Sequence, residues 1–353
     1  MPGAQLLVTG DLNFMNVTDA ATPFARIAGR LAQADAVFSN MECCLYSGSA
    51  DTHLSEGFYA DPKVAGEALK TGRITAVGIA NNVNYGNAAI ESSIRHLDAI
   101  GVGHAGAGSD LKAATAPALF ERGGVRYGVL QRSSVYWPTS HEAGPATPGI
   151  AVIRGHTAYQ VPEHRARPGI PPMNRPGIPP TIITWANDKY LNAFTDDIAA
   201  LRPKVDVLVA SCHWGVGKEV LDYMTQIAHA AIEAGADAVI GHGPHYSLPV
   251  EVYRGRPIFY GLGSFSFHTG HQGKHGDWIG LLGCFDIDAK RPAGSIAATS
   301  FQFVRHDDDN HTYLCDPARE AADLKELTER SAALGAKLTL EGDRIAVSAI
   351  EPS

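Results

Sequence analysis

Apolar and polar positions alternate along the chain with two periods, and the switches between them predict strands and helices. Short runs of aliphatic and β-branched residues are typical of strands, whereas apolar residues spaced three and four apart are typical of helices. The predicted strands of the first part are Leu6–Gly10, Ala36–Asn40, Ala76–Ala80, Val125–Gln131, Val205–Ser211, Ala238–Gly241 and Ile258–Gly261. The predicted helices are Pro23–Ala32, capped by Thr22, with Pro62–Thr71, Ala88–Ile100, Tyr190–Ala200 and Tyr223–Ala234.

Strands that alternate with helices of this length indicate parallel β-α-β units. The end of the chain differs, because Trp278–Ile287 and Ile296–Arg305 predict antiparallel strands, followed by a helix at Ala322–Leu334 and a strand at Arg344–Ile350. No stretch has the composition of an interdomain linker. We therefore expect one layered α/β domain over residues 1–353, with mostly parallel strands.

A proline-rich segment from about 145 to 180 interrupts this alternation. It contains Arg-Pro-Gly-Ile-Pro-Pro twice, starting at Arg167 and at Arg175. Proline removes backbone donors and fixes φ, so the segment predicts neither a central strand nor a helix. It is an insert, either a flexible loop or an ordered lid.

Composition excludes several classes of function. The 353 residues carry a net charge of −8, which argues against nucleic acid as a partner because phosphate binding needs a basic surface. No apolar run is long enough to span a membrane, and the chain enters its first strand without a signal sequence, so a cytoplasmic location is expected. Five cysteines without C-x-x-C spacing favour neither a disulfide framework nor a zinc knuckle.

Side chains that suit metal ions follow several predicted strands. They are Asp11 and Asn13, Asn40 and Glu42, Asn81 and Asn82, His213, and His242 with His245. Because parallel strands present their carboxyl ends at one edge of a sheet, these groups are expected to converge. Carboxylates, imidazoles and an amide oxygen suit Zn, Mn or Fe, and the set is large enough for two divalent ions. Taken singly, each residue also fits a structural role: Asp11 as a helix cap, Asn81-Asn82 as turn residues, and each histidine as a hydrogen-bonding group.

The motifs and their order along the sequence resemble those of a known family. The segments concerned are Val8–Asp11, Phe38–Glu42, Ala80–Asn82 with Tyr85–Gly86, Ala105–Gly108, His213–Gly215, Gly241–His245 and Tyr260–Phe265. Together they resemble the bacterial capsule-synthesis CapA family (poly-γ-glutamate biosynthesis), which is related to the calcineurin-like metallophosphatases. The resemblance implies a metallophosphatase-like sandwich. It also implies six metal ligands: Asp11, Glu42, Asn82, His213, His242 and His245.

The chain departs from the family pattern at three places. Asn13 stands where metallophosphatases carry the histidine of Asp-x-His, and Ser264 stands where the family has asparagine. The block Asn81-Asn82-Val83-Asn84-Tyr85-Gly86 is two residues shorter than that of the family and lacks its histidine, which in metallophosphatases assists the leaving group. Another acid could substitute for that histidine.

The resulting hypothesis is a metal-dependent hydrolase that attacks an amide, ester or phosphoester with an activated water. His268 is the chosen general acid, ahead of His271, His275, His53 and Glu56, and Asn13 is a second catalytic candidate. Arg132 is expected either to clamp a carboxylate or phosphate of a small-molecule or peptide-like substrate or to form a surface ion pair. Trp214 is expected either to wall the pocket or to lie in the core. The alternative is a non-catalytic binding or assembly component of capsule polymer handling, with a degenerate site.

Overall fold

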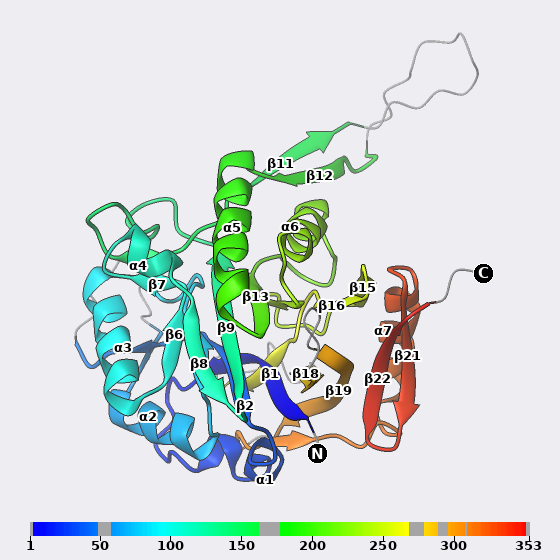
Figure 1. Ribbon diagram of the computed structural model, residues 1–353, viewed down its shortest axis with the longest axis horizontal. Coiled ribbons are helices and arrows are strands. Elements are labelled where there is room, and N and C mark those ends of the chain that lie inside the picture. Colours follow the sequence, from blue (N-terminus) through cyan, green and yellow to red (C-terminus); the bar gives the residue numbers. More distant parts are fainter. Residues whose placement is uncertain are drawn as a thin grey trace.

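Two β-sheets lie face to face, and helices cover the outer face of each (Figure 1). The computed structural model describes residues 3–48, 58–161, 177–267, 279–288, 296–307 and 309–350. Within these residues the first sheet has ten strands and the second has six. The layered α/β architecture expected from the strand and helix pattern is therefore confirmed.

The first sheet is parallel on one side of β1 (Ala4–Asn13) and antiparallel on the other. The parallel side continues through β2 (Ala36–Met41), β5 (Ala76–Gly78) and β6 (Gly103–Ala105). The antiparallel side contains β18 (Gly280–Ile287), β19 (Ile296–His306), β22 (Arg344–Ala349) and β21 (Ala336–Glu341). Two short strands join it: β17 (Ser264–Phe267) pairs with β1, and β20 (Thr312–Leu314) with β19.

The second sheet has a parallel centre and antiparallel edges. Its central strands are β9 (Val125–Ser133), β13 (Val207–His213), β14 (Ala238–His242) and β16 (Arg256–Phe259). The edges are β8 (Ala118–Arg122) and β15 (Val250–Tyr253). Inward-facing Val8 and Phe38 of the first sheet and Val209 of the second belong to one buried cluster, so a shared core holds the sheets together.

Amphipathic helices bury one face against each sheet. The first sheet is covered by α2 (Pro62–Thr71) and α3 (Asn87–Ile100), and the second by α5 (Asp188–Leu201) and α6 (Asp222–Glu233). The remaining elements are η1 (Thr22–Phe24), α1 (Ala28–Leu31), α4 (Leu111–Thr115), η2 (Arg202–Lys204), α7 (Ala321–Ala332), β3 (Cys44–Leu45), β4 (Tyr59–Ala60), β7 (Ala107–Gly108) and β10 (Gly149–Ile150). None of the described helices is long and apolar enough to cross a membrane.

Two predictions need correction. The single helix expected at Pro23–Ala32 is two short pieces, η1 and α1, and Ala21 rather than Thr22 precedes the first. The segment from 145 to 180 is also not free of strands. It contains β10 and β11 (Gly155–Gln160), and β11 pairs with β12 (Thr181–Ala186) in a hairpin that projects beyond the helices (Figure 1). Residues 162–176, which hold most of the repeat, lie outside the described part.

Candidate metal centre

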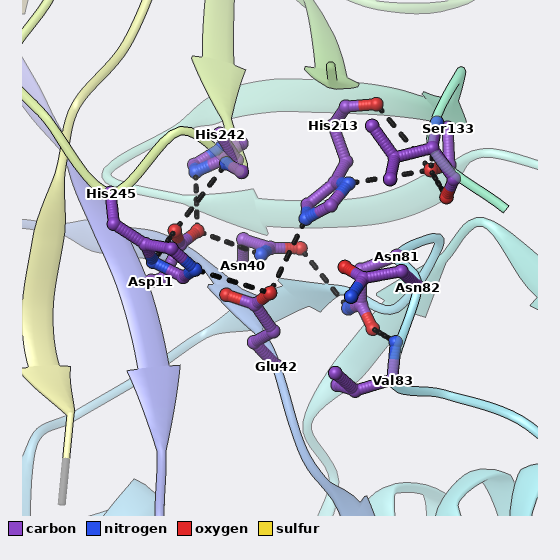
Figure 2. Close-up of polar contacts among 12 residues, drawn as sticks. Asp11, Asn40, Glu42, Asn81, Asn82, Val83, Ser133, His213, His242 and His245 are labelled. Carbon is purple, nitrogen blue, oxygen red and sulfur yellow. Dashed lines mark hydrogen bonds and ion pairs between the residues drawn. The ribbon is translucent and has the colours of Figure 1, made fainter. Parts of the chain in front are cut away.

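Five metal-competent side chains meet where the two sheets present their strand ends (Figure 2). Asp11 belongs to β1, and Glu42 directly follows β2 in the same sheet. His213 and His242 are the last residues of β13 and β14 in the other sheet, and His245 follows shortly after. The convergence predicted from the strand ends is present, because the parallel halves of both sheets end on the same side.

A break in the strand pairing directs Asp11 into the cluster. The register of β1 with β2 shifts between Val8 and Asp11, and its register with β17 shifts between Asp11 and Leu12. At this break the backbone N–H of Asp11 donates to the carbonyl oxygen of Gly263 at 2.9 Å. Such irregularities re-aim a side chain without ending the strand, and they are frequent beside functional sites.

Each of the five groups lies within 4 Å of at least one other. Asp11 Oδ1 is 3.4 Å from His242 Nδ1, and Asp11 Oδ2 is 3.2 Å from His245 Nδ1. Glu42 Oε1 lies between the imidazoles of His213 and His245, 3.4 Å from His213 Nε2 and 3.8 Å from His245 Nε2. One ligand atom each of Asp11, Glu42 and His245 lies within 4.8 Å of the other two, which is the spacing of ligands around one cation.

Backbone geometry beyond β14 turns the chain back towards Asp11. Gly243 has φ +104°, and His245 has φ +63°, a left-handed conformation that costs a non-glycine residue energy. The strained turn places the His245 ring against both carboxylates. Gly241 is needed for a different reason: a Cβ atom there would lie 2.1 Å from the Tyr260 carbonyl oxygen and 2.5 Å from Trp214 Nε1.

Several polar atoms of the cluster are buried without a hydrogen-bond partner among the described residues. They are Glu42 Oε2, His242 Nδ1 and His242 Nε2. At 3.4 Å from Asp11, His242 Nδ1 is close enough for electrostatic attraction but makes no hydrogen bond. Leaving a buried polar group unpaired costs roughly 1–3 kcal/mol. Such groups, together with a carboxylate pair, fit the donor set of a divalent transition-metal ion.

Charges within the cluster shift the pKa values of two of its members. Burial opposes ionisation of Asp11, but the imidazoles of His242 and His245 outweigh this effect, and the pKa of Asp11 lies far below its usual value. Burial also lowers the pKa of His245, whereas the carboxylates of Glu42 and Asp11 raise it, with a net pKa of about 9. The centre thus favours positive charge on His245 beside the Asp11 and Glu42 side chains.

Amide side chains surround the cluster. Asn40 is the register partner of Asp11, and its Nδ2 donates to Asp11 Oδ1 at 2.8 Å. The side chain of Asn81 donates to the Met41 carbonyl at 2.8 Å, which holds its loop against β2. Ser133 Oγ is 3.4 Å from His213 Nδ1. Partners of this kind orient metal ligands and adjust their basicity.

The other predicted site residues lie in different environments. Asn82 is half-buried in the loop beside the cluster, and its carbonyl oxygen accepts a hydrogen bond from the Trp137 indole at 2.8 Å. Asn13 is fully buried at the end of β1, where its Oδ1 accepts from the Met15 N–H at 2.8 Å and its Nδ2 has no partner among the described residues. His268, the chosen general acid, lies outside the described residues, as do His271, His275, His53 and Glu56.

Arg132 does not lie in the cluster. Its side chain is buried on the α5 side of the second sheet, where Nη2 pairs with Asp197 and the guanidinium lies 5.1 Å from the Phe194 ring centre. Residues alternate between the two faces of a strand, so Arg132 points away from the face occupied by its neighbour Gln131. The geometry gives Arg132 a structural ion pair and argues against the predicted role as a substrate clamp.

Trp214 is also structural. It is fully buried in the helix-side core of the second sheet, and its Nε1 donates to the Tyr260 carbonyl at 2.8 Å across Gly241. The indole therefore ties the end of β13 to the segment after β16, and it does not line an open pocket as predicted. The five cysteines are buried and free of disulfides, as expected.

Sequence reasoning missed two residues near the centre. Gln131 hydrogen-bonds to Asn40 from the opposite sheet. His141 is buried in the loop after β9, where Nδ1 accepts from the Trp137 N–H at 3.0 Å and Nε2 lies 3.1 Å from the Asn84 carbonyl. Burial lowers the pKa of His141 to about 4, so its ring is neutral and fastens the loop. Gln131 ends the predicted strand Val125–Gln131, so the strand-end pattern could have indicated it. His141 lies in a loop without a recognisable motif, so only the three-dimensional structure could identify it.

Comparison with known proteins identifies relatives that share parts of this chain. An uncharacterised protein of Sinorhizobium fredii, y4sH, is 27% identical over 284 residues, which are 69% of this chain and 61% of that protein. A protein of Mycobacterium tuberculosis, named as a probable polyglutamine synthesis accessory protein, is 30% identical over 56% of this chain and 46% of its own length. The PGA biosynthesis protein CapA of Bacillus subtilis is 40% identical over 22% of this chain and 21% of its own. The chain thus spans less than two thirds of each of these relatives.

Among solved structures, a phosphatase from Mycoplasma pneumoniae aligns with 93% of this chain and 99% of its own, at 13% identity and a TM-score of 0.44. The family model of the bacterial capsule synthesis protein PGA_cap matches residues 5–269, a span that begins in β1 and includes all five residues of the metal-competent cluster. The chain belongs to the bacterial capsule synthesis PGA_cap family.

Proposed function

We propose that the chain is a metal-dependent hydrolase that cleaves an amide, ester or phosphoester, with its site at the cluster of Asp11, Glu42, His213, His242 and His245. One observation carries this proposal. Four strand ends from two sheets direct carboxylates and imidazoles towards one point, and Glu42 and His242 keep buried polar atoms unpaired there. A purely structural cluster would be expected to satisfy those atoms.

The donor set divides into two groups that share Glu42. Asp11, His242 and His245 would hold one divalent ion, because both imidazoles contact the Asp11 carboxylate. His213 and Asn82 would hold a second, with Glu42 between the two because Glu42 Oε1 contacts both His213 and His245. Two ions of Mn, Zn or Fe are the expected cofactor.

A bound ion of this kind would supply Lewis acidity and an activated water near neutral pH. The chain's own residues do the positioning. Asn40 holds one oxygen of Asp11, and Ser133 approaches the far nitrogen of His213, so both ligands are held in place before a substrate arrives. Asn13 keeps a buried Nδ2–H group without a described partner, and we propose it as a donor to the reacting group. His268 remains the proposed general acid.

A substrate class follows from the family and from the chemistry. Relatives are named for PGA biosynthesis and for polyglutamine synthesis, so the amide of a γ-glutamyl polymer is one candidate. A smaller amide, a lactone or a phosphoester would be activated by the same centre. All of these are small-molecule or peptide-like substrates.

A second candidate function is non-catalytic binding or assembly during capsule polymer handling. Two observations favour it: Val83 stands where the family motif has its histidine, and one relative is named as an accessory protein. In this case the cluster would serve structure or ligand binding rather than turnover.

Metal analysis of the purified protein separates the two functions. Elemental analysis should find about two equivalents of metal per protein, one for each of the two groups of donors that share Glu42. Hydrolysis of a γ-glutamyl peptide, a lactone or an aryl phosphate should require Mn²⁺ or Zn²⁺ and stop on chelation. Asp11→Ala and His245→Ala should lose both metal and activity, whereas His96→Ala on the exposed face of α3 should lose neither. A folded wild-type protein with no metal and no turnover would support the binding component.

A further inference from the structure

We propose that Gln131 is a positioning residue of the metal centre: its side-chain amide sets the orientation of Asn40 and, through Asn40, that of the Asp11 carboxylate. This inference rests on the proposed metal-binding function. Gln131 belongs to β9 in the second sheet, whereas Asn40 and Asp11 belong to the first. One buried amide therefore links the two halves of the site.

The contacts form a continuous chain of hydrogen bonds. The backbone N–H of Ala80 donates to Gln131 Oε1 at 2.6 Å, and Gln131 Nε2 donates to Asn40 Oδ1 at 3.0 Å. Asn40 Nδ2 then donates to Asp11 Oδ1 at 2.8 Å. Gln131, Asn40 and Asp11 are all fully buried, so water does not compete with these bonds.

The groups at the two ends of this series of hydrogen bonds determine which side-chain atoms donate and which accept. A backbone N–H can only donate, so Gln131 must turn its oxygen to Ala80 and its nitrogen to Asn40. Asn40 must then accept with its oxygen and turn its own nitrogen to Asp11. An ionised carboxylate can only accept, so the sequence of donors and acceptors closes without conflict. The orientation of three side chains follows from one peptide group.

The surrounding backbone makes room for this amide. A Cβ atom at Gly78 would lie 2.2 Å from Gln131 Nε2, and one at Gly106 would lie 2.7 Å from Gln131 Oε1. Any larger residue at either position would displace the Gln131 side chain. The space for Gln131 is thus specified by two glycines, one in β5 and one after β6.

The hydrogen bonds indicate different roles for Asn40 and Asp11. Asn40 Oδ1 accepts from Gln131 and lies 3.4 Å from the Asn81 amide nitrogen, so Asn40 orients a ligand and is not one itself. Asp11 Oδ1 is held by a charge-assisted bond, and Asp11 Oδ2 is 3.2 Å from His245. Rotation of Asn40 by half a turn would bring its oxygen against the carboxylate and push Asp11 out of place.

Gln131→Glu tests the proposal with almost no change of shape. The introduced carboxylate can still accept a hydrogen bond from the Ala80 N–H, but when ionised it cannot donate to Asn40. The Asn40 amide should therefore rotate by half a turn, and its oxygen should repel the Asp11 carboxylate. We expect the affinity for Mn²⁺ to fall by about ten- to a hundredfold, the effect typical of losing an outer partner of a metal ligand. Calorimetric titration with Mn²⁺ gives the affinity, and the visible spectrum of the Co²⁺-loaded protein reports any change of ligand geometry.

Gln302→Glu is the matched control. Gln302 is a buried glutamine in β19 whose oxygen accepts from Arg30 at 2.8 Å and whose nitrogen donates to the Asp343 carboxylate at 2.8 Å. The change removes a donor to a side-chain oxygen, here that of Asp343, as Gln131→Glu removes the donor to the Asn40 oxygen, but away from the site. This control should alter stability without altering the Mn²⁺ affinity or the Co²⁺ spectrum.

A readout without metal separates this inference from the proposed function. In the metal-free protein, the Asn40 side-chain amide, assigned by its absence in Asn40→Asp, should exchange hydrogen slowly in the wild type and faster in Gln131→Glu. Equal exchange in both proteins would overturn the positioning role. Equal Mn²⁺ affinity of the two would overturn it as well, with the metal site left intact. If the Asn40 amide exchanges slowly in the wild type and quickly in Gln131→Glu, but neither protein binds Mn²⁺, the positioning of Asn40 is supported and only the metal site is rejected.

Gln131→Met covers the case in which Gln131→Glu does not fold. Methionine has nearly the same length and adds no charge, but it makes neither hydrogen bond, so Asn40 loses the partner that orients it. The variant should show weaker Mn²⁺ binding and faster Asn40 exchange. Wild-type values of both would contradict the proposal.

Discussion

His213 and His242 are register partners: they are the last residues of two neighbouring parallel strands, β13 and β14. Neighbouring strands lie about 4.8 Å apart, so the two imidazoles leave the sheet side by side. His213 contacts Glu42 and His242 contacts Asp11, so each imidazole faces a different carboxylate of the opposite sheet. The pair therefore contributes to both halves of the proposed centre.

Replacing either histidine should weaken metal binding. His213→Ala and His242→Ala each remove one donor, so each should reduce the metal retained after dialysis, with an affinity loss of at least about tenfold. Elemental analysis of the dialysed proteins measures this. Wild-type metal content in both variants would contradict a shared centre.

Metal binding should depend strongly on pH. The pKa of His245 is about 9 because Glu42 and Asp11 stabilise its protonated form against the effect of burial. A cation must displace that proton, so the apparent affinity should rise by about tenfold per pH unit and level off above pH 9. Calorimetry in buffers of different ionisation enthalpy should detect about one proton released from His245 per protein molecule at neutral pH. Affinity that does not change between pH 6.5 and 9 would contradict the assignment of His245 as a ligand.

The metal-free protein should show the linked change in stability. A pKa raised from 6.5 to about 9 stabilises the fold fully below pH 6.5, and this contribution is lost as the pH rises through 9. Urea unfolding of chelator-treated protein should therefore show decreasing stability over that range. His245→Gln should flatten the decrease, because glutamine does not titrate.

His141 should produce the opposite dependence at acidic pH. Burial lowers the pKa of His141 to about 4, so the folded state favours the neutral ring and loses stability as the pH falls from 6.5 towards 4. His141→Gln should lower the melting temperature at neutral pH, since its contacts to Trp137 and Asn84 are altered, but reduce the decline in acid. An unchanged acid profile would assign that decline to other groups.

Asp197→Asn distinguishes a structural Arg132 from a substrate clamp. Arg132 is buried and pairs with the partly exposed Asp197, so the substitution removes the charge opposite a buried guanidinium and should cost about 1–3 kcal/mol in the free energy of unfolding. The metal content and KM of the folded protein should stay unchanged. A rise in KM without loss of stability would restore Arg132 to the substrate site.

Substitution of Gly241 tests the hydrogen bond between the Trp214 indole and the Tyr260 carbonyl. Gly241→Ala would place a methyl group against the Tyr260 carbonyl and the Trp214 indole, so a loss of about 1–3 kcal/mol is expected in urea unfolding. Gly29→Ala in α1 is the matched control, because nothing lies within 4 Å of its added Cβ. That change should be neutral or stabilising.

The sequence was sufficient for elements whose pattern is local. The proposed site lies at strand ends, so the convergence of Asp11, Glu42, His213 and His242 could be predicted from apolar runs that stop at a polar residue. The α2 and α3 helices were predicted within one residue because Pro62 starts one and Gly101 ends the other. These signals depend on neighbouring residues only.

Features that depend on contacts between distant residues could not be predicted. The register shift at Asp11 arises from pairing with both β2 and β17, and the roles of Gln131 and Arg132 depend on which face of β9 meets which layer. The helix expected at Pro23–Ala32 is divided into η1 and α1 although Phe24, Ile27 and Leu31 all enter the core at helical spacing, so the local pattern does not reveal the break. Tertiary contacts override local preference in these cases.

The division of the centre between two sheets has a consequence for assembly. Asp11 and Glu42 come from one sheet, and His213 and His242 from the other, so neither half alone holds a full donor set. A cation would bind tightly only after the sheets have docked, and it would then stabilise the interface between them. Loading would therefore be a late step in the maturation of the chain, and a checkpoint that a misdocked molecule fails.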